Sequence, residues 1–249
     1  MRAAVIWRVG WTVVAVVVVE AIVCGLAAAP ALLLWLRLTE LTATAGSVVR
    51  IAAFSVAIVP SYILFAVCLM VSSACATRMT GARTSPNTEM RIADMDWRLM
   101  SWARYTAAIH VVRILAGTVF RGSPVWTAYL RFNGARMGRR VYVNTTSISD
   151  HNLLECGDDV VIGADVHISG HTVERGIVKT AAVRLGRNVT IGLGSVVDID
   201  VEIGDACEIG ALSLVPKHAR LEPGAIYAGI PVRRIGHSTV PPDSIKVPA

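Results

Sequence analysis

Charged and aromatic residues are scarce in this sequence. Of its 249 residues, 17% are Asp, Glu, Lys or Arg and 6% are Phe, Trp or Tyr, whereas 54% are hydrophobic. This composition is too apolar for an ordinary soluble domain. The apolar excess is concentrated near the beginning of the chain, where it forms two long runs.

Cysteine is also scarce, and no CxxC pair or disulfide framework is visible. The cysteines are therefore predicted to be small buried residues in a reducing compartment. They are Cys24, Cys68, Cys75, Cys156 and Cys207. The sequence also lacks a P-loop, a Rossmann glycine fingerprint, a GxSxG turn and an HExxH helix in the expected context, which argues against the chemistry that each of these motifs supports.

Two apolar runs are each long enough to cross a bilayer, which takes about 20 helical residues. The first runs from Val9 to Leu36 and is interrupted by Glu20, which is either a functional group or a packing contact between helices. The second runs from Ile51 to Ser72. The first run is too long for a secretory signal and lacks a cleavage site. We therefore predict a transmembrane hairpin over 1–78, with spans at about 9–36 and 51–72; a buried hairpin of a soluble protein is the alternative.

The arginines around the two runs predict their orientation. They are more frequent before the first run and after the second than in the segment between the runs. The outer arginines are Arg2, Arg8, Arg78, Arg83 and Arg91, and the connecting segment has Arg37 and Arg50 with Glu40. Because positive charge favours the cytoplasmic side, both ends should be cytoplasmic. This predicts a multi-pass protein of the inner (plasma) membrane with its C-terminal part in the cytoplasm.

A segment rich in both arginine and aromatic residues follows the hairpin, between Asp96 and Gly138. Such side chains suit the headgroup region of a membrane. We therefore expect interfacial helices over 79–136. Nucleic acid is the alternative partner for a chain of net charge +6, but no nucleic-acid-binding motif accompanies the arginines, so none is expected.

Eight six-residue units run without a break from Leu185 to Val232. They read LGRNVT, IGLGSV, VDIDVE, IGDACE, IGALSL, VPKHAR, LEPGAI and YAGIPV. The first position is almost always a branched aliphatic residue, the second is often Gly, and the fifth is mostly small or β-branched. This period indicates a parallel β-helix, in which each unit forms a strand and a turn and three units close a triangular coil. A helix would repeat near 3.6 residues and a single strand near 2.

Less regular units precede this run. CGDDVV, IGADVH and ISGHTV are in phase from Cys156 to Val173, and MGRRVY and VNTTSI fit if one extra residue is allowed near Glu155. Between Ile168 and Leu185 the phase slips by five residues, which predicts a loop from about His171 to Ala182. Insertions in repeat proteins are often on the binding face. The repeat domain is predicted over 137–236 and a C-terminal tail over 237–249.

The repeats resemble those of the hexapeptide-repeat acyltransferases, which include maltose, xenobiotic and serine acetyltransferases. The stretch GSPVWTAYLRFNGARMGRRVYV, from Gly122 to Val143, is similar to membrane-linked members related to the C-terminal region of poly-amino-acid synthetases. The resemblance covers Trp97 to Ile235. It implies a left-handed parallel β-helix, a homotrimer with active sites between subunits, and transfer of an acyl group from acetyl-CoA or another acyl-CoA.

In the segment ISGHTVERGIVK, His171 falls at the position of the family's catalytic histidine. Histidine titrates near neutrality and suits a general base that removes a proton from a hydroxyl or an amine. Asp150 lies 21 residues earlier, a little more than the three units of one coil, so both residues are expected on the same edge. Asp150 is our candidate for orienting the base or the substrate. His167 is the alternative base.

Three polar residues of the first coil, Asn144, His151 and Asn152, are candidate contacts to the acceptor. The reaction also needs a hydrogen-bond donor for the oxyanion, and a backbone N–H of a neighbouring turn, such as that of Gly194, is the candidate. A zinc site, as in the related γ-type carbonic anhydrases, is an alternative role for His167 and His171. A third ligand at the required spacing is not evident, so no metal is expected.

The segment IGALSLVPKHARLEPGAIYAGIPVRRIG resembles the last coils that hold coenzyme A in this family. Lys217, Arg233 and Arg234 are candidates for pairing with its phosphates. Small residues are candidates for shaping a narrow groove for the pantetheine arm. They are Gly192, Gly194, Ser195, Ala211 and Gly229, and Pro231 follows them.

With the resemblance, these features predict a membrane-anchored acyltransferase in which His171 is the general base. The acceptor is expected to be a hydroxyl or an amine of a sugar, a glycolipid or another cell-envelope precursor. Two alternatives are an amide-forming condensation from a carrier-bound aminoacyl thioester and a non-catalytic β-helix scaffold.

Overall fold

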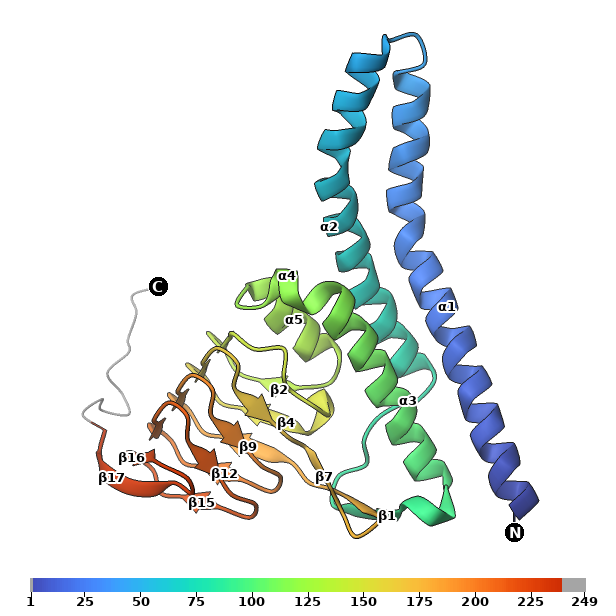
Figure 1. The fold of residues 1–249 in the computed structure, drawn as a ribbon. Helices are drawn as coiled ribbons and strands as arrows, with labels where there is room; N and C mark the ends of the chain where they lie inside the picture. The colour runs from blue at the N-terminus through green and yellow to red at the C-terminus, as the bar shows by residue number, and fades with distance from the viewer. Residues whose placement is uncertain (1, 239–249) are drawn as a thin grey trace.

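The computed structural model describes residues 2–238 of the chain (Figure 1). Most of the predicted C-terminal tail, 237–249, lies outside these residues. Helices α1 (Arg2–Leu41) and α2 (Ser47–Met79) form a hairpin that projects beyond the rest of the molecule, with shorter helices and a coiled β-domain beside its base. The order of these parts along the chain is the one that the sequence predicts.

Both hairpin helices are long and apolar enough to cross a membrane by length and composition. At 1.5 Å per residue, the 33 residues of α2 measure about 50 Å, more than the about 30 Å of bilayer hydrocarbon. Each helix therefore extends beyond its predicted span. The hairpin is held by apolar contacts of Val23 and Ala27 with α2 and by a hydrogen bond from the Trp35 indole to Ser61 Oγ, at 2.9 Å.

The segment between the hairpin and the repeats contains one strand and several short helices. They are β1 (Thr88–Arg91), η1 (Ile92–Asp94), α3 (Trp97–Val112), the π-helical turn η2 (Arg113–Gly117), α4 (Thr118–Phe120) and α5 (Pro124–Phe132). Helix α3 begins after Asp96, whose carboxylate accepts the backbone N–H of Leu99 at 2.8 Å, and α5 begins with Pro124 after the cap Ser123. Helix α3 packs against both α1 and α2, and this segment lies between the hairpin and the β-domain in Figure 1.

The β-domain is a parallel β-helix with three sheets, each visited once per coil. Sheet I has the order β15-β12-β9-β4-β2, with β2 (Arg136–Met137), β4 (Leu154–Cys156), β9 (Val183–Leu185), β12 (Glu202–Ile203) and β15 (Arg220–Leu221). Sheet II has the order β17-β16-β13-β10-β5-β3, with β3 (Tyr142–Val143), β5 (Val161–Ile162), β10 (Thr190–Ile191), β13 (Glu208–Ile209), β16 (Ala225–Ala228) and the antiparallel β17 (Arg233–His237). Sheet III has the order β14-β11-β6, with β6 (His167–Ile168), β11 (Val196–Val197) and β14 (Leu214–Val215).

The register of the coils is the one that the hexapeptide pattern predicts. Val197, in the first position of its unit, pairs with Ile168 below it and Val215 above it, and all three are buried. Val189 and Val201, in the fifth positions of their units, are fully buried as well. Stacking of these side chains inside the triangle forms the core. The parallel β-helix is thus confirmed, and its left-handed winding is an expectation from the family resemblance.

The phase slip corresponds to an inserted hairpin at the corner between sheets III and I. Strands β7 (His171–Glu174) and β8 (Ile177–Thr180) pair with each other, and β8 also pairs with β1. The predicted loop is therefore a small antiparallel sheet that includes a strand from outside the repeats. The extra residue of the first coil lies in the turn η3 (His151–Leu153), just before Glu155.

Candidate active site

Asp150 and His171 are brought together by the stacking of the first two coils. Ile148 pairs with Ile168, so Asp150 lies beside Gly170 at the corner from which the inserted hairpin begins. Asp150 adopts a left-handed backbone conformation, with φ 49°, as do other corner residues of the solenoid. A Cβ atom on Gly170 would lie 2.7 Å from Asp150 Cβ, so this close approach requires glycine.

The carboxylate of Asp150 binds the imidazole of His171. His171 Nδ1 lies 2.5 Å from Asp150 Oδ2, as their spacing in the sequence predicted. Because a carboxylate only accepts hydrogen bonds, Nδ1 carries the proton and Nε2 of the neutral ring keeps its lone pair. The Asp150 side chain is 1% exposed and that of His171 is 23% exposed, so the pair is buried on one side and open on the other.

Two residues from the segment between the hairpin and the repeats hold the second oxygen of Asp150. The Thr84 hydroxyl donates to Oδ1 at 2.5 Å, and the Trp102 indole N–H donates to the same atom at 3.2 Å. The Trp102 ring also meets the His171 ring edge-on, with centroids 5.0 Å apart. Sequence reasoning missed Thr84, which carries no motif, and assigned Trp102 to the membrane surface.

The pairing of Asp150 with His171 shifts the pKa values of both side chains. Burial alone would raise the pKa of Asp150, but hydrogen bonds from His171, Thr84 and Ser149, together with the charge of His171, lower it. Burial alone would lower the pKa of His171, but the hydrogen bond to Asp150 and its negative charge raise it. The arrangement therefore favours a carboxylate beside an imidazole that readily accepts a proton.

His167, the alternative base, lies on the outer face of β6. Its side chain makes no hydrogen bond within residues 2–238, so it lacks the carboxylate that orients His171. In the same part of the chain, no group of three or more His, Cys, Asp or Glu side chains is placed to hold a metal ion. The geometry thus favours His171 over His167.

The predicted acceptor contacts are divided among three environments. His151 is buried, and its Nδ1 lies 2.9 Å from Asn133 Nδ2; burial lowers its pKa to about 4. The prediction that His151 contacts the acceptor is therefore wrong, because the ring lies in the interior. Asn152 binds the backbone of Thr84 through both ends of its amide, at 2.8 and 3.3 Å. Asn144 follows β3 at the corner between sheets II and III, away from the corner that holds His171.

The small residues predicted to form the cofactor groove gather at the corner between sheets II and III. A Cβ atom on Gly192 would lie 2.5 Å from the backbone N of Ala211, which shows how closely the coils stack there. Ser195 accepts the backbone N–H of Ser213, and Gly229 donates to the Ser213 hydroxyl, in turns stacked along this corner. Pro231 follows in the turn before β17.

The backbone N–H of Gly194 donates to the carbonyl of Ala164 at 2.9 Å. The prediction that Gly194 supplies the oxyanion donor is therefore wrong, because its N–H is used by the coil itself.

The three cations predicted to bind phosphate do not form one cluster. Lys217 lies at the corner between sheets III and I, where it contacts Thr172 Oγ1 at 3.1 Å and forms an ion pair with Glu174 of the inserted hairpin. Arg233 and Arg234 lie on β17 at the edge of sheet II, and Arg234 pairs with Glu222 at 2.9 Å. Lys217 therefore fastens the inserted hairpin to the coils.

No family model matches the chain. By sequence, it is 25% identical over 138 residues to the delta-poly-L-ornithine synthetase of Acinetobacter baumannii, covering 55% of this chain and 10% of the relative. It is 34% identical over 120 residues to the galactoside O-acetyltransferase of Escherichia coli, covering 45% of this chain and 57% of the relative. The chain thus spans a tenth of the first relative and little more than half of the second.

Solved structures match part of the chain as well. A galactoside acetyltransferase in complex with coenzyme A has a TM-score of 0.45 at 22% identity, with 61% of this chain and 86% of that chain covered. A maltose O-acetyltransferase from Clostridium difficile has a TM-score of 0.42 at 18% identity, with 56% and 89% covered.

The sequence relatives agree with the resemblance drawn from the repeats, because one of them is an O-acetyltransferase. The prediction of an enzyme of this class agrees with these relatives too.

Proposed function

We propose that the chain is a membrane-anchored acyltransferase. It transfers an acetyl or another short acyl group from acyl-CoA to a hydroxyl or an amine of a sugar, a glycolipid or another cell-envelope precursor. The observation that carries this proposal is the buried Asp150 carboxylate on Nδ1 of His171, which leaves Nε2 available as a base.

In the proposed reaction, His171 Nε2 accepts the proton of the acceptor's hydroxyl or amine while the acceptor's oxygen or nitrogen attacks the thioester carbonyl. The tetrahedral intermediate then collapses, the C–S bond breaks, and the CoA thiolate takes the proton from the imidazolium. Asp150 fixes the tautomer and stabilises the imidazolium by its charge. General-base catalysis of this kind contributes about 10²–10⁴-fold to the rate.

In this proposal the acyl-CoA donor and the base, His171, lie at different corners of sheet III. The small-residue corner of Gly192, Gly194 and Gly229 would hold the pantetheine arm, and His171 lies at the opposite edge. The family resemblance implies a homotrimer. In a homotrimer the groove of one copy can face His171 of the next copy, so the acyl donor and the base can meet. Arg233, at the exposed end of sheet II, remains available to pair with a CoA phosphate.

The membrane part of the proposal rests on α1 and α2. The two helices are long and apolar, and the arginines favour a cytoplasmic position for both ends. The β-domain would then act at the inner leaflet of the plasma membrane, which suits an acceptor that is itself attached to a lipid. Tethering confines the enzyme and this acceptor to one surface.

A second candidate is an amide-forming condensation from a carrier-bound aminoacyl thioester. Similarity to the delta-poly-L-ornithine synthetase favours it, although this chain matches only 10% of that relative. The same base would deprotonate an amine, and the leaving group would be a carrier thiol. A non-catalytic scaffold is the third possibility, and the buried Asp150–His171 pair argues against it because such a pair costs desolvation without a structural need.

The test is thiol release by the purified, detergent-solubilised protein, given acetyl-CoA or longer acyl-CoAs with an extract of polar and lipid-linked glycans. We expect release by the unmodified chain, its loss in His171→Ala, and its retention in His218→Ala as the matched control. Mass spectrometry of the extract then identifies the acceptor. Absence of release and of CoA binding would refute the CoA reaction and favour the carrier thioester or the scaffold.

A further inference from the structure

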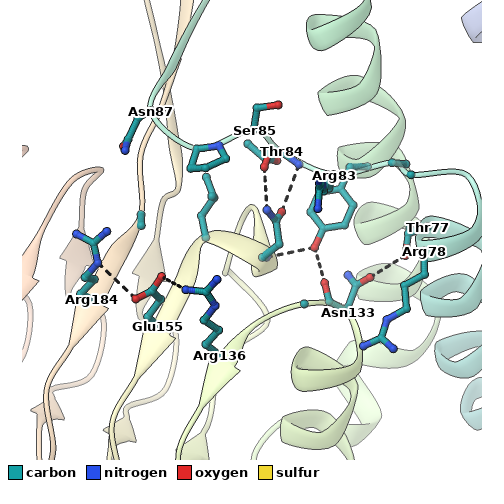
Figure 2. A pocket seen from close by; sticks show the side chains of 18 residues that line it. Thr77, Arg78, Arg83, Thr84, Ser85, Asn87, Asn133, Arg136, Glu155 and Arg184 are labelled. Carbon is teal, nitrogen blue, oxygen red and sulfur yellow. Dashed lines mark hydrogen bonds and ion pairs between the residues drawn. The ribbon is translucent and has the colours of Figure 1, made fainter.

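A cavity of about 790 Å³ lies between the base of the hairpin and the first coils (Figure 2). The last turn of α2, the 80–87 loop and the end of α5 form one side of it, and sheet I forms the other. Of the predicted acceptor contacts, Asn152 lines this cavity, but its outline was not predictable because its walls come from five stretches of the chain, within 77–87, at Tyr105, and within 133–136, 152–155 and 182–184. None of the predicted cofactor residues lines it.

Four arginines and one glutamate line the cavity, a net charge of +3. Figure 2 shows Arg136 and Arg184 on either side of Glu155, at 3.1 and 3.4 Å from its oxygens. Arg78 and Arg83 come from the opposite side. Within residues 2–238 no carboxylate pairs with either of them, and the Arg78 guanidinium lies over the Phe132 ring, 4.4 Å from its centroid. Arg184 also pairs with Glu202, outside the cavity, at 2.8 Å, so the uncompensated positive charge of the wall is that of Arg78 and Arg83.

The rest of the wall combines neutral hydrogen-bonding groups with apolar side chains such as Leu153 and Ala182. Ser85 and Asn87 line the cavity near the arginines, whereas Thr77 and Asn133, also in the wall, are buried and hydrogen-bonded to each other at 3.1 Å. Guanidinium groups match the geometry of phosphate oxygens through paired N–H donors, and hydroxyl and amide groups complete such sites. The lining thus suits an anion with several oxygens better than it suits an apolar ligand.

The position of the cavity relates it to the membrane surface. Arg78 lies about 9 Å along α2 beyond the end of the predicted second span, which is just beyond a headgroup layer about 5–8 Å deep. The cavity also adjoins the active site, since Thr84 lines it and donates to Asp150. A ligand there would contact the residue that holds the carboxylate of the base.

We propose that this cavity binds a phosphate or diphosphate group carried by a molecule at the membrane surface. On the proposed function, that group belongs to the lipid-linked acceptor, and the site selects acceptors that carry it. A soluble phosphate-bearing molecule offers the same chemistry, so the two sources must be separated by experiment.

The first experiment measures binding of inorganic pyrophosphate to the full-length protein in phosphatidylcholine nanodiscs by calorimetry. We expect binding that weakens with salt. Arg83→Gln should reduce the affinity about tenfold or more, the usual loss for a hydrogen bond to a charged group, and Arg83→Lys should lose less. Arg98→Gln is the matched control, because Arg98 is an exposed arginine on α3 outside the cavity.

A second experiment distinguishes the sources of the phosphate. The same titration is repeated in bilayers that contain phosphatidic acid, a lipid with a phosphomonoester headgroup. If pyrophosphate binds in plain phosphatidylcholine but not in bilayers that contain phosphatidic acid, the lipid competes for the site and a lipid-borne phosphate is the ligand. Unchanged pyrophosphate binding identifies a soluble phosphate-bearing ligand instead.

The proposal is overturned if pyrophosphate does not bind, or if Arg83→Gln and Arg98→Gln weaken it equally. His171→Ala separates this result from the proposed reaction. It should bind pyrophosphate as the unmodified chain does while releasing no thiol. If the unmodified chain binds pyrophosphate but transfers no acyl group, the proposed reaction is refuted and the phosphate site is not.

Discussion

His171 and His218 each bind an aspartate at the corner between sheets III and I, and the two pairs differ mainly in their surroundings. The Nδ1–oxygen distances are 2.5 Å to Asp150 and 2.7 Å to Asp200. However, the side chain of Asp150 is 1% exposed and that of Asp200 is 29% exposed, while His171 is 23% exposed and His218 is 68% exposed. The contact alone is therefore an ordinary product of stacking, and burial makes one of the pairs distinctive.

The added parts account for this difference. His171 belongs to an inserted hairpin, and Asp150 receives hydrogen bonds from Thr84 and Trp102, which lie outside the repeats. Asp200 instead binds an exposed arginine, Arg220, at 2.9 Å. A repeat fold provides many equivalent corners, and a catalytic site requires that one corner be covered and its charges be held by fixed donors.

The largest expected effect separates the two histidines directly. His171→Ala should lower kcat/KM for acyl transfer by about 10²–10⁴-fold, because it removes the proposed general base. His218→Ala should leave kcat/KM within about twofold. Thiol-release kinetics on both variants measure this, and equal losses would show that the buried pair has no special role.

The next effect concerns the pH dependence. The raised pKa of His171 means that the neutral base is lost as the pH falls through that pKa, so kcat/KM should decline on the acid side. Asp150→Asn removes the charge that raises the pKa, whereas burial still lowers it. The acid limb should therefore move to lower pH, with a loss of about 100-fold in kcat/KM at its maximum, the lower end of what general-base catalysis contributes. An acid limb that stays in place in this variant would contradict the assignment.

A smaller effect is expected from the donors that hold Asp150. Thr84→Val removes one hydrogen bond to a carboxylate, and kcat should fall about tenfold with little change in KM. Thr84→Ser should restore most of the rate. Trp102→Phe keeps a ring against His171 and should lose less, and Trp97→Phe, an exposed tryptophan on the same helix, is its control. Changes in KM alone would indicate that these residues contact the substrate instead.

The smallest effect belongs to the exposed pair. Asp200→Asn should change the free energy of unfolding by less than about 1 kcal/mol, because surface ion pairs contribute little and the solvent screens them. Chemical denaturation of the detergent-solubilised protein measures this. A loss of several kcal/mol would mean that the exposure of a side chain does not predict how much its ion pair contributes to the free energy of unfolding.

Sequence reasoning was most reliable where one residue type repeats at a fixed period. The stacked positions from Leu185 to Tyr227, the place of the insertion at the phase slip and the contact of Asp150 with His171 all follow from counting residues along coils, whereas the predicted loop turned out to be a β-hairpin. It failed where the decisive contact depends on a segment without periodicity. Thr84 carries no pattern, and the burial of His151 depends on Asn133 and the packing of α5, which no spacing reveals.

The pairing of β1 with β8 has a consequence for how this protein is divided into parts. The sequence places boundaries at 78 and 136, which would make the hairpin, the linker and the β-helix separable modules. Yet β1 continues the sheet of the inserted hairpin, and the 80–87 loop supplies a donor to the aspartate of the site. The linker is thus a piece of the candidate site rather than a tether. A fragment that begins at the first repeat keeps every coil but cannot reproduce the environment of His171.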